Sequence, residues 1–283
     1  MPNDTEKGLA PLVESLTLGK TTAYPEHYAP ELLQPVPRVL NRNPLGVQAD
    51  ALPFVGADRW TCYELSWLNN EGVPRVAIAE VTVPATSTNL IESKSFKLYL
   101  NSFNQTRVAS ERELINILTK DLSTCAGAPV IVQMFSIREY TALGVGLPNA
   151  HCIDEAEVEN VSFAYQPEQL QADTSNIVTE ALYTDLLKSN CLITNQPDWG
   201  TLCIQYTGPQ IDRGKLLSYV IGFRNHNEFH EQCVERIFID LGKYLKPHEL
   251  CVEARYTRRG GLDINPWRAT TNTPQLMPRL VRQ

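Results

Sequence analysis

A weak internal repeat limits most strongly what this chain can fold into. The segment "LYLNSFNQTRVASERELINIL", which starts at residue 98, is matched 120 residues later by "SYVIGFRNHNEFHEQCVERIF". Each segment predicts two helices with a break between them, and a strand-like stretch follows each one. The aligned pairs of similar side chains are Tyr99 with Tyr219, Phe103 with Phe223, Glu111 with Glu231, Leu114 with Val234, and Ile117 with Ile237. The repeat therefore predicts two α+β modules in tandem.

Further patterns support helices and strands in both copies. "PRVAIAEVTVP" at 74–84 and "PVIVQMFSIREY" at 129–140 are rich in β-branched and aromatic residues, which favour strands. In the second copy, apolar residues recur at helical spacing and predict one buried stripe. These residues are Val234, Ile237, Phe238, Leu241 and Leu245.

We divide the chain into four parts, because 283 residues accommodate two average domains. One stretch between the copies is acidic, polar and weakly periodic, which predicts a connection. The parts are an N-terminal leader packed on the first module (1–50), the first module (51–147), the connection (148–175) and the second module (176–283).

Composition and charge exclude several classes of protein. A hydrophobic content of 43% and a charged content of 20% are typical of a globular chain. The net charge of −7 argues against nucleic-acid binding, although "RYTRRGG" at 255–261 is a local basic patch. No apolar run approaches the roughly 20 residues that span a bilayer, and the first residues lack the features of a signal peptide. We expect a soluble cytoplasmic protein without a nucleic-acid or membrane partner.

The cysteines and the missing motifs narrow the chemistry. Seven cysteines, odd in number and scattered, suit reduced thiols better than a disulfide framework. The chain lacks the glycine-rich Rossmann and P-loop phosphate motifs. It also lacks a Cys-x-x-Cys pair, and His226 with His230 alone is a weak zinc signal. We therefore expect no metal.

One cysteine differs from the others in its surroundings. Cys191 lies in "SNCLITNQPDWG" at 189–200, beside polar residues and outside any apolar stripe, and Asp198 follows on a turn. The thiol could fill the core, ligate a metal or act as a nucleophile. The aspartate could be a turn residue or the proton partner of the thiol. The pattern alone leaves these alternatives open.

Other candidate residues also have ordinary structural interpretations. Glu231 and Glu92 suit the starts of helices, where carboxylates are stabilised. The 120-residue shift aligns His230 with Ser110, whose "SERE" sequence predicts a capping box with Glu113. Such a cap typically contributes ~1 kcal/mol. A histidine in its place hints at another role for that side chain.

Four separated stretches together resemble one enzyme family. The stretches are "ESKSFKLYLNSFNQT" at 92–106, "SNCLITNQPDWG" at 189–200, "FRNHNEFHEQCVERI" at 223–237 and "RYTRRGGLDINPWR" at 255–268. They resemble the long, two-module form of NADPH-dependent 7-cyano-7-deazaguanine reductase, the nitrile-reducing enzyme of queuosine biosynthesis. The resemblance implies tandem tunnelling-fold modules, each with an antiparallel sheet and two helices packed on one face. It also implies a homodimer.

The resemblance assigns roles to particular residues. The cysteine that attacks the nitrile carbon would be Cys191, and the aspartate that supplies a proton would be Asp198. His230 is a third catalytic candidate, since histidine exchanges protons near neutral pH. Contacts to the deazaguanine are implied for Ile91, Glu92, Ser93, His230 and Glu231. Contacts to NADPH are implied for Ser93, Lys94, Arg259 and Gly260.

The chemistry of a nitrile explains why these residue types are needed. A nitrile carbon accepts hydride poorly, whereas a thioimide formed with a cysteine resembles an imine and accepts it more readily. Reduction to the aminomethyl group consumes two NADPH, and we expect one active centre in each chain. The alternatives are a cysteine-dependent nitrile or amide hydrolase and a non-catalytic purine- or pterin-binding protein.

Overall fold

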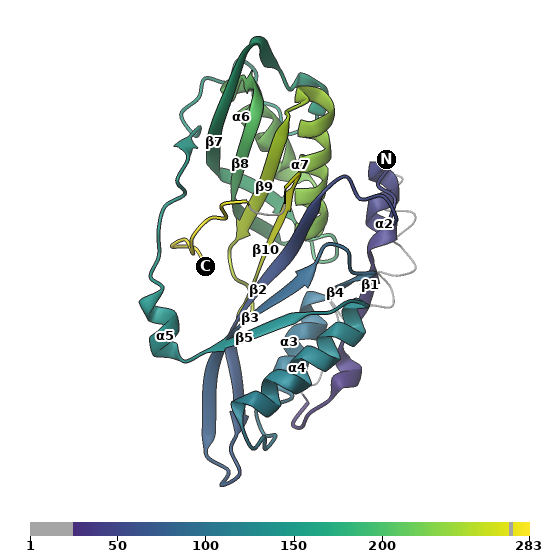
Figure 1. Cartoon of the computed structure of the whole chain (residues 1–283), viewed down its shortest axis with the longest axis vertical. Coiled ribbons are helices and arrows are strands. Elements are labelled where there is room, and N and C mark those ends of the chain that lie inside the picture. Colours follow the sequence, from purple (N-terminus) through teal and green to yellow (C-terminus); the bar gives the residue numbers. More distant parts are fainter. Residues whose placement is uncertain (1–24, 272–273) are drawn as a thin grey trace. The chain divides into compact units, whose positions relative to one another are not determined.

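The computed structural model describes residues 25–271 and 274–283 (Figure 1). These residues form two compact units, each of which combines helices with a mainly antiparallel sheet. Unit 1 contains the described residues up to Leu52, together with Ala57–Gly144 and Arg258–Asp263. Unit 2 contains Pro53–Gly56, Val145–Thr257 and the described part of Ile264–Gln283.

Unit 1 is built on a sheet with the strand order β5-β3-β2, in which all neighbours are antiparallel. A two-stranded sheet, β1 with β4, supplements it. The strands are β1 (Pro35–Pro37), β2 (Val55–Leu68), β3 (Pro74–Pro84), β4 (Asn89–Ile91) and β5 (Ile131–Phe135). The helices are η1 (Pro30–Leu32), α2 (Arg38–Arg42), η2 (Asn43–Leu45), α3 (Ser93–Asn101), α4 (Glu111–Ala126) and α5 (Ile137–Ala142).

Local sequence fixes where the two main helices of unit 1 begin and end. The Glu92 carboxylate caps α3 by accepting hydrogen bonds from the backbone N–H groups of Lys94 and Ser95. Ser110 caps α4 by accepting from the Glu113 N–H, and Gly127 ends that helix with a positive φ of 68°. Apolar side chains then join α3 to the sheet, for example Phe96, whose ring centroid lies 5.2 Å from that of Trp60 on β2.

The described part of the predicted leader, residues 25–50, packs within unit 1. The Tyr28 hydroxyl donates to Asp121 on α4 at 2.6 Å, and its ring lies 5.1 Å from that of Phe103. Arg38 forms a fully buried ion pair with Asp58 of β2. Residues 1–24 of the leader lie outside the described residues.

Unit 2 is built on a sheet with the strand order β10-β9-β8-β7-β6, antiparallel except for the short β6–β7 pair. The strands are β6 (His151–Cys152), β7 (Ala172–Asn190), β8 (Pro197–Ile211), β9 (Glu249–Tyr256) and β10 (Leu262–Ala269). The helices are η3 (Pro167–Gln169), α6 (Arg213–Ile221), η4 (Gly222–Asn225) and α7 (His230–Leu245). Figure 1 shows α6 and α7 along one face of this sheet. The five predicted stripe residues of α7 are all buried, which confirms that prediction.

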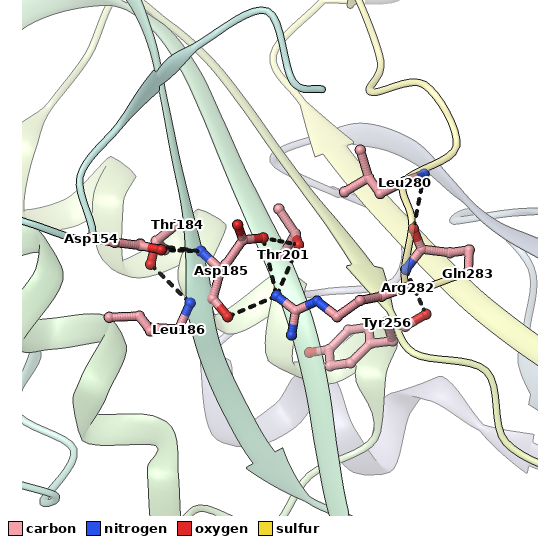
Figure 2. A network of polar contacts seen from close by, with 9 residues as sticks. All are labelled: Asp154, Thr184, Asp185, Leu186, Thr201, Tyr256, Leu280, Arg282 and Gln283. Carbon is pink, nitrogen blue, oxygen red and sulfur yellow. Dashed lines mark hydrogen bonds and ion pairs between the residues drawn. The ribbon is translucent and has the colours of Figure 1, made fainter. Parts of the chain in front are cut away.

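The last residues of the chain are tied to the strands of unit 2 (Figure 2). Met277 and Leu280 are buried in a cluster with Cys203 of β8. The Arg282 guanidinium donates to the backbone oxygen and the carboxylate of Asp185 at 2.9 and 3.0 Å. The Gln283 side-chain amide donates to the carbonyl of Tyr256, at the end of β9, at 3.1 Å.

The two units repeat one plan, ββαα followed by further strands, so the predicted α+β fold with tandem tunnelling-fold modules is confirmed. Helix α6 begins 120 residues after α3, and α7 begins 119 residues after α4. The repeat extends to "YAPELLQ" at 28–34 and "YQPEQLQ" at 165–171. In both units the carbonyl of the last glutamine of this motif accepts the N–H of a helix-capping residue at 3.0 Å, from Glu92 at the start of α3 and from Asp212 at the start of α6.

The structure departs from the sequence-based description at three places. The strand predicted at 129–140 ends at Phe135, because Ser136 and Glu139 form a capping box that starts α5. Residues 148–175 belong to unit 2, where they supply β6, η3 and the start of β7. Residues 258–263 belong to unit 1, because Asp263 bonds the Thr61 N–H and the Tyr63 hydroxyl.

Candidate functional site

Cys191 lies in unit 2, directly after the last residue of β7. Its N–H donates to the carbonyl of Gln196 at 2.8 Å, which closes the hairpin between β7 and β8. The next pair on the same side of the hairpin is Ser189 opposite Asp198. Side chains two residues apart along a strand share a face, and diagonal neighbours across an antiparallel pair lie within reach of each other. Cys191 and Asp198 are such diagonal neighbours, and both are buried.

His230 is the first residue of α7 and meets this hairpin. Its Nε2 lies 3.3 Å from the carboxylate of Asp198, and both side chains are largely buried. Its ring stacks on the ring of Tyr256 with centroids 3.8 Å apart and an interplanar angle of 4°. The unit thus brings a carboxylate and an imidazole into contact at the hairpin that ends at Cys191, an arrangement that suits proton transfer to and from a sulfur nucleophile.

The N-cap of α7 is Phe229, so the expectation that His230 replaces the capping Ser110 is wrong by one residue. The spacing between the two copies falls from 120 to 119 within the preceding loop, which aligns Phe229 with Ser110. Phe229 makes no side-chain capping bond. Glu231 is the second residue of α7, is 4% exposed, and lies where a carboxylate is stabilised by the helix N-terminus.

Buried polar atoms without a hydrogen-bond partner gather around this hairpin and the start of α7. They include Thr194 Oγ1, His230 Nδ1 and both amide atoms of Gln232. Such atoms are uncommon in folded proteins and are often found where a ligand or a reaction uses them. Among the described residues of unit 1, the corresponding atoms belong to Asn41 alone. This contrast directs the search for a functional site to unit 2.

The other buried thiols are poorly suited to nucleophilic attack. Burial raises the pKa of Cys125 to about 11 and that of Cys203 to about 12. It also raises the pKa of Cys62, Cys233 and Cys251 well above the ordinary value. Because the thiolate is the reactive form, these five cysteines serve packing rather than reaction.

A second polar group borders the hairpin. Asn190 exchanges backbone hydrogen bonds with His226 and Glu228 at 2.8 and 3.1 Å. The buried Glu228 carboxylate lies 3.0 Å from His226 Nε2 and accepts from the Arg236 guanidinium. Burial alone would raise the pKa of Glu228, but His226 and Arg236 hold it below the ordinary value. This ion-pair group fixes the loop that enters α7.

The predicted residues Ile91, Glu92, Ser93 and Lys94 lie in unit 1, at the start of α3. Glu92 is 2% exposed, and both of its carboxylate oxygens accept from the backbone of the helix. Burial raises the pKa of Glu92, and its bonds to Lys94 and Ser95 oppose that change. The helix-start interpretation of Glu92 therefore holds, and any base-binding role would be additional.

Arg259 and Gly260 form a turn in the same unit. Gly260 and Gly261 have φ values of 59° and 80°, and a Cβ at Gly260 would lie 2.9 Å from Lys97 Nζ on α3. The turn therefore lies against α3, one helical turn beyond Ser93. Arg258 and Arg259 are exposed there, while Lys94 and Lys97 are half-buried. Cations and close backbone approach of this kind suit the phosphates of a dinucleotide.

Sequence reasoning missed two residues that the structure places beside the predicted ones. Tyr256 supports the His230 ring, and Lys97 borders the Arg259–Gly260 turn. The spacing of three residues between Lys94 and Lys97 on one helix could have indicated the second. Nothing local in the sequence indicated the first, because 26 residues separate it from His230.

The described residues offer neither a metal-ligating cluster nor a membrane-spanning helix. Within residues 25–271 and 274–283, His, Cys, Asp and Glu side chains do not come together in threes as a metal site would require. None of the described helices combines the length and the apolar character needed to cross a bilayer.

Family models match both halves of the chain. A model described as "Nitrile reductase, 7-cyano-7-deazaguanine-reductase N-term" matches residues 24–134, and a model described as "QueF-like protein" matches residues 197–275. Together they cover more than half of the chain. Asp198, His230 and Arg259 fall in the second matched range, and Cys191 lies between the two.

A solved structure is also similar, that of an archaeosine synthase QueF-Like in the apo form. Its sequence is 14% identical, and the alignment covers 37% of this chain and 100% of that chain with a TM-score of 0.30. Neither this identity nor this TM-score says anything about the activity of the present chain.

Proposed function

Because the chain belongs to the QueF family of nitrile reductases, we propose that it reduces the nitrile of 7-cyano-7-deazaguanine to an aminomethyl group. In this proposal NADPH is the reductant and Cys191 forms a covalent thioimide. The reaction would be a step of queuosine biosynthesis in the cytoplasm, carried out by a homodimer. The observation that carries the proposal is the contact of Asp198 with His230 at the hairpin that ends at Cys191.

The first step forms a carbon–sulfur bond. The Cys191 thiol transfers its proton to the Asp198 carboxylate, and the sulfur adds to the nitrile carbon. The electron pair displaced from the C≡N bond goes to nitrogen, which takes the proton back from Asp198 to give a neutral thioimide. His230 Nε2, 3.3 Å from that carboxylate, stabilises its negative charge before the first transfer and after the second.

NADPH would be held in unit 1 by Ser93, Lys94, Arg259 and Gly260, with Lys97 and Arg258 as neighbouring cations, and would supply a hydride in each of two rounds. Between the rounds the carbon–sulfur bond breaks and the sulfur regains its proton, for which Asp198 and His230 are the available donors. The thiol is thereby restored, so a single cysteine serves the whole reaction.

Recognition of the base would rest on carboxylates. A deazaguanine presents a ring N–H and an exocyclic amine side by side, and a carboxylate accepts both. We assign this contact to Glu231, beside His230, with Glu92, Ile91 and Ser93 as further contacts. An analogue that lacks one donor would leave a buried carboxylate oxygen unpaired, and would therefore bind much more weakly.

Intact-mass spectrometry of the protein mixed with 7-cyano-7-deazaguanine, without NADPH, tests this proposal. We expect a covalent adduct on the wild-type protein and on Cys203→Ala, a buried-thiol control, and none on Cys191→Ala. Adding NADPH should discharge the adduct and consume two NADPH per nitrile. Release of a carboxylate without cofactor would indicate a hydrolase instead. Tight binding of the base without any adduct would indicate a binding protein.

A further inference from the structure

The face of the His230 ring is covered by Tyr256, the last residue of β9. The two ring centroids lie 3.8 Å apart and the planes are within 4° of parallel. An imidazole at the start of a helix has freedom to rotate about its side-chain torsions, and a flat ring pressed against it removes much of that freedom. In this stacked orientation Nε2 meets the Asp198 carboxylate at 3.3 Å.

Tyr256 is itself fixed from several sides. It is fully buried, its N–H donates to the Asn265 side chain at 3.2 Å, and its carbonyl accepts from Gln283 at 3.1 Å (Figure 2). A support held by backbone bonds on both sides cannot shift without disturbing β9 and β10 together. The sheet, through Tyr256, therefore fixes the position of the imidazole. The first turn of α7 contributes less, because it has no side-chain cap.

The ring of Tyr256, rather than its hydroxyl, is the part that acts on His230. The polar neighbours of the hydroxyl are the Cys233 thiol and the Ser189 hydroxyl rather than His230. Burial, with Cys233 and Asp198 nearby, raises the pKa of Tyr256 well above its ordinary value, so the phenol stays neutral. Toward the imidazole, a neutral phenol supplies shape and an aromatic face, which phenylalanine would also supply.

We infer that Tyr256 is a positioning residue: its ring holds the imidazole of His230 in line with Asp198 for proton transfer. The role in proton transfer rests on the proposed function, whereas the stacking of the two rings rests on geometry alone. A displacement of about 1 Å in a catalytic group can lower a rate about 100-fold. Loss of the aromatic face should therefore lower kcat much more than it changes KM.

The test compares Tyr256→Phe, Tyr256→Leu and Tyr256→Met, with Tyr206→Leu as a control for the loss of a buried tyrosine elsewhere in unit 2. Methionine fills the space flexibly and guards against failure of the leucine variant to fold. We expect Tyr256→Phe to stay within about 3-fold of wild type, and the leucine and methionine variants to lose about 10- to 100-fold in kcat with little change in KM. Tyr206→Leu should keep the wild-type kcat per folded molecule.

A spectroscopic readout separates this inference from the proposed function. The His230 ring protons, assigned by comparison with His230→Gln, should show an upfield ring-current shift that persists in Tyr256→Phe and disappears in Tyr256→Leu and Tyr256→Met. Failure of the wild-type protein to reduce the nitrile would overturn the proposed function, while this shift would still test the stack. Equal losses of kcat in the phenylalanine and leucine variants, or an unchanged ring shift in the leucine variant, would overturn the positioning role.

Discussion

Asn69 in unit 1 and Cys191 in unit 2 hold the same place in two hairpins that are built alike. The Asn69 N–H donates to Val73 and the Cys191 N–H donates to Gln196, each closing a hairpin by one backbone bond. Asn69 then uses its own side chain to bind the Val73 N–H at 2.8 Å. The Cys191 thiol makes no corresponding hydrogen bond across the turn of its own hairpin among the described residues. This leaves it available for the reaction proposed above.

The same contrast recurs beside the hairpins. Ser189 faces Asp198 in unit 2 where Trp67 faces Arg75 in unit 1. Elsewhere the copies agree: Tyr99 and Tyr28 both donate to Asp121, just as Tyr219 and Tyr165 both donate to Asp240. These shared positions hold the helices to each other, while Cys191 and Asp198 differ from their counterparts at one end of the unit 2 hairpin. A comparison of the copies thus separates residues of the fold from residues of the site.

Replacing Asp198, the carboxylate that unit 1 lacks at the equivalent position, should have the largest effect on turnover. Asp198→Asn keeps the size of the side chain but cannot carry a proton, so turnover should fall by about 10²- to 10⁴-fold. Steady-state NADPH oxidation with the nitrile as substrate measures this loss. The matched control is Arg75→Gln, at the equivalent position of unit 1, which should leave turnover unchanged. Equal effects of the two substitutions would remove the distinction between the copies.

The dependence of stability on pH should reveal a second difference between the two units. Glu228 in unit 2 is equivalent to Val108 in unit 1. Each N–H donates to the carbonyl of the residue that ends the first strand of its hairpin, Asn190 of β7 or Leu68 of β2. The pKa of Glu228 is lowered in the folded state from an ordinary value of 4.5. The ionised carboxylate therefore stabilises the fold fully above pH 4.5, and this stabilisation is lost as the pH falls through the lowered folded-state pKa.

Glu228→Gln should accordingly lower the free energy of unfolding by about 3 kcal/mol at pH 7, because Arg236 would lose its buried carboxylate. The difference from wild type should shrink as the pH falls below the ordinary glutamate value. Urea unfolding at several pH values measures both effects, and hydrogen exchange of residues 226–236 locates them. Glu249→Gln, an exposed carboxylate of β9, is the control. A difference that stays constant with pH would contradict the assignment of the ion pair.

The helix caps should give the smallest effect. Ser110→Ala removes the cap of α4 and should lower the free energy of unfolding by about 1 kcal/mol, whereas Ser110→Gly should cost only a few tenths of that, about 0.3 kcal/mol. Turnover per folded molecule should not change in either variant. Thermal and urea unfolding measure the cost. If Ser110→Ala left the free energy of unfolding unchanged, the hydrogen bond from the Glu113 N–H would not be a source of stability.

The sequence predicted those parts of the molecule that rest on local patterns. Strand β3 runs over the predicted residues 74–84, because this segment is rich in β-branched residues, which favour a strand. The α7 stripe and the break between α3 and α4 were predicted for the same reason. The strand predicted at 129–140 failed at Ser136, where a short capping box outweighs β propensity.

Other features depend on residues that are distant in the sequence. The stack of His230 on Tyr256 and the contact of His230 with Asp198 arise only when α7 packs on β8 and β9. The one-residue change of spacing between the copies is hidden, because a low-identity repeat aligns almost equally well with shifts of 119 and 120. Resemblance to a family supplied the site residues, and the geometry supplies their partners.

The hydrogen bonds of Asp263 bear on how the chain folds during its synthesis. Asp263 binds the Thr61 N–H and the Tyr63 hydroxyl, across sequence separations of 202 and 200 residues. A ribosome must therefore deliver nearly all of unit 2 before β2 of unit 1 meets this partner. Contacts so distant in sequence slow folding, since a long loop must close before they form. The N-terminal half of a nascent chain would wait, incompletely bonded, for a segment made much later.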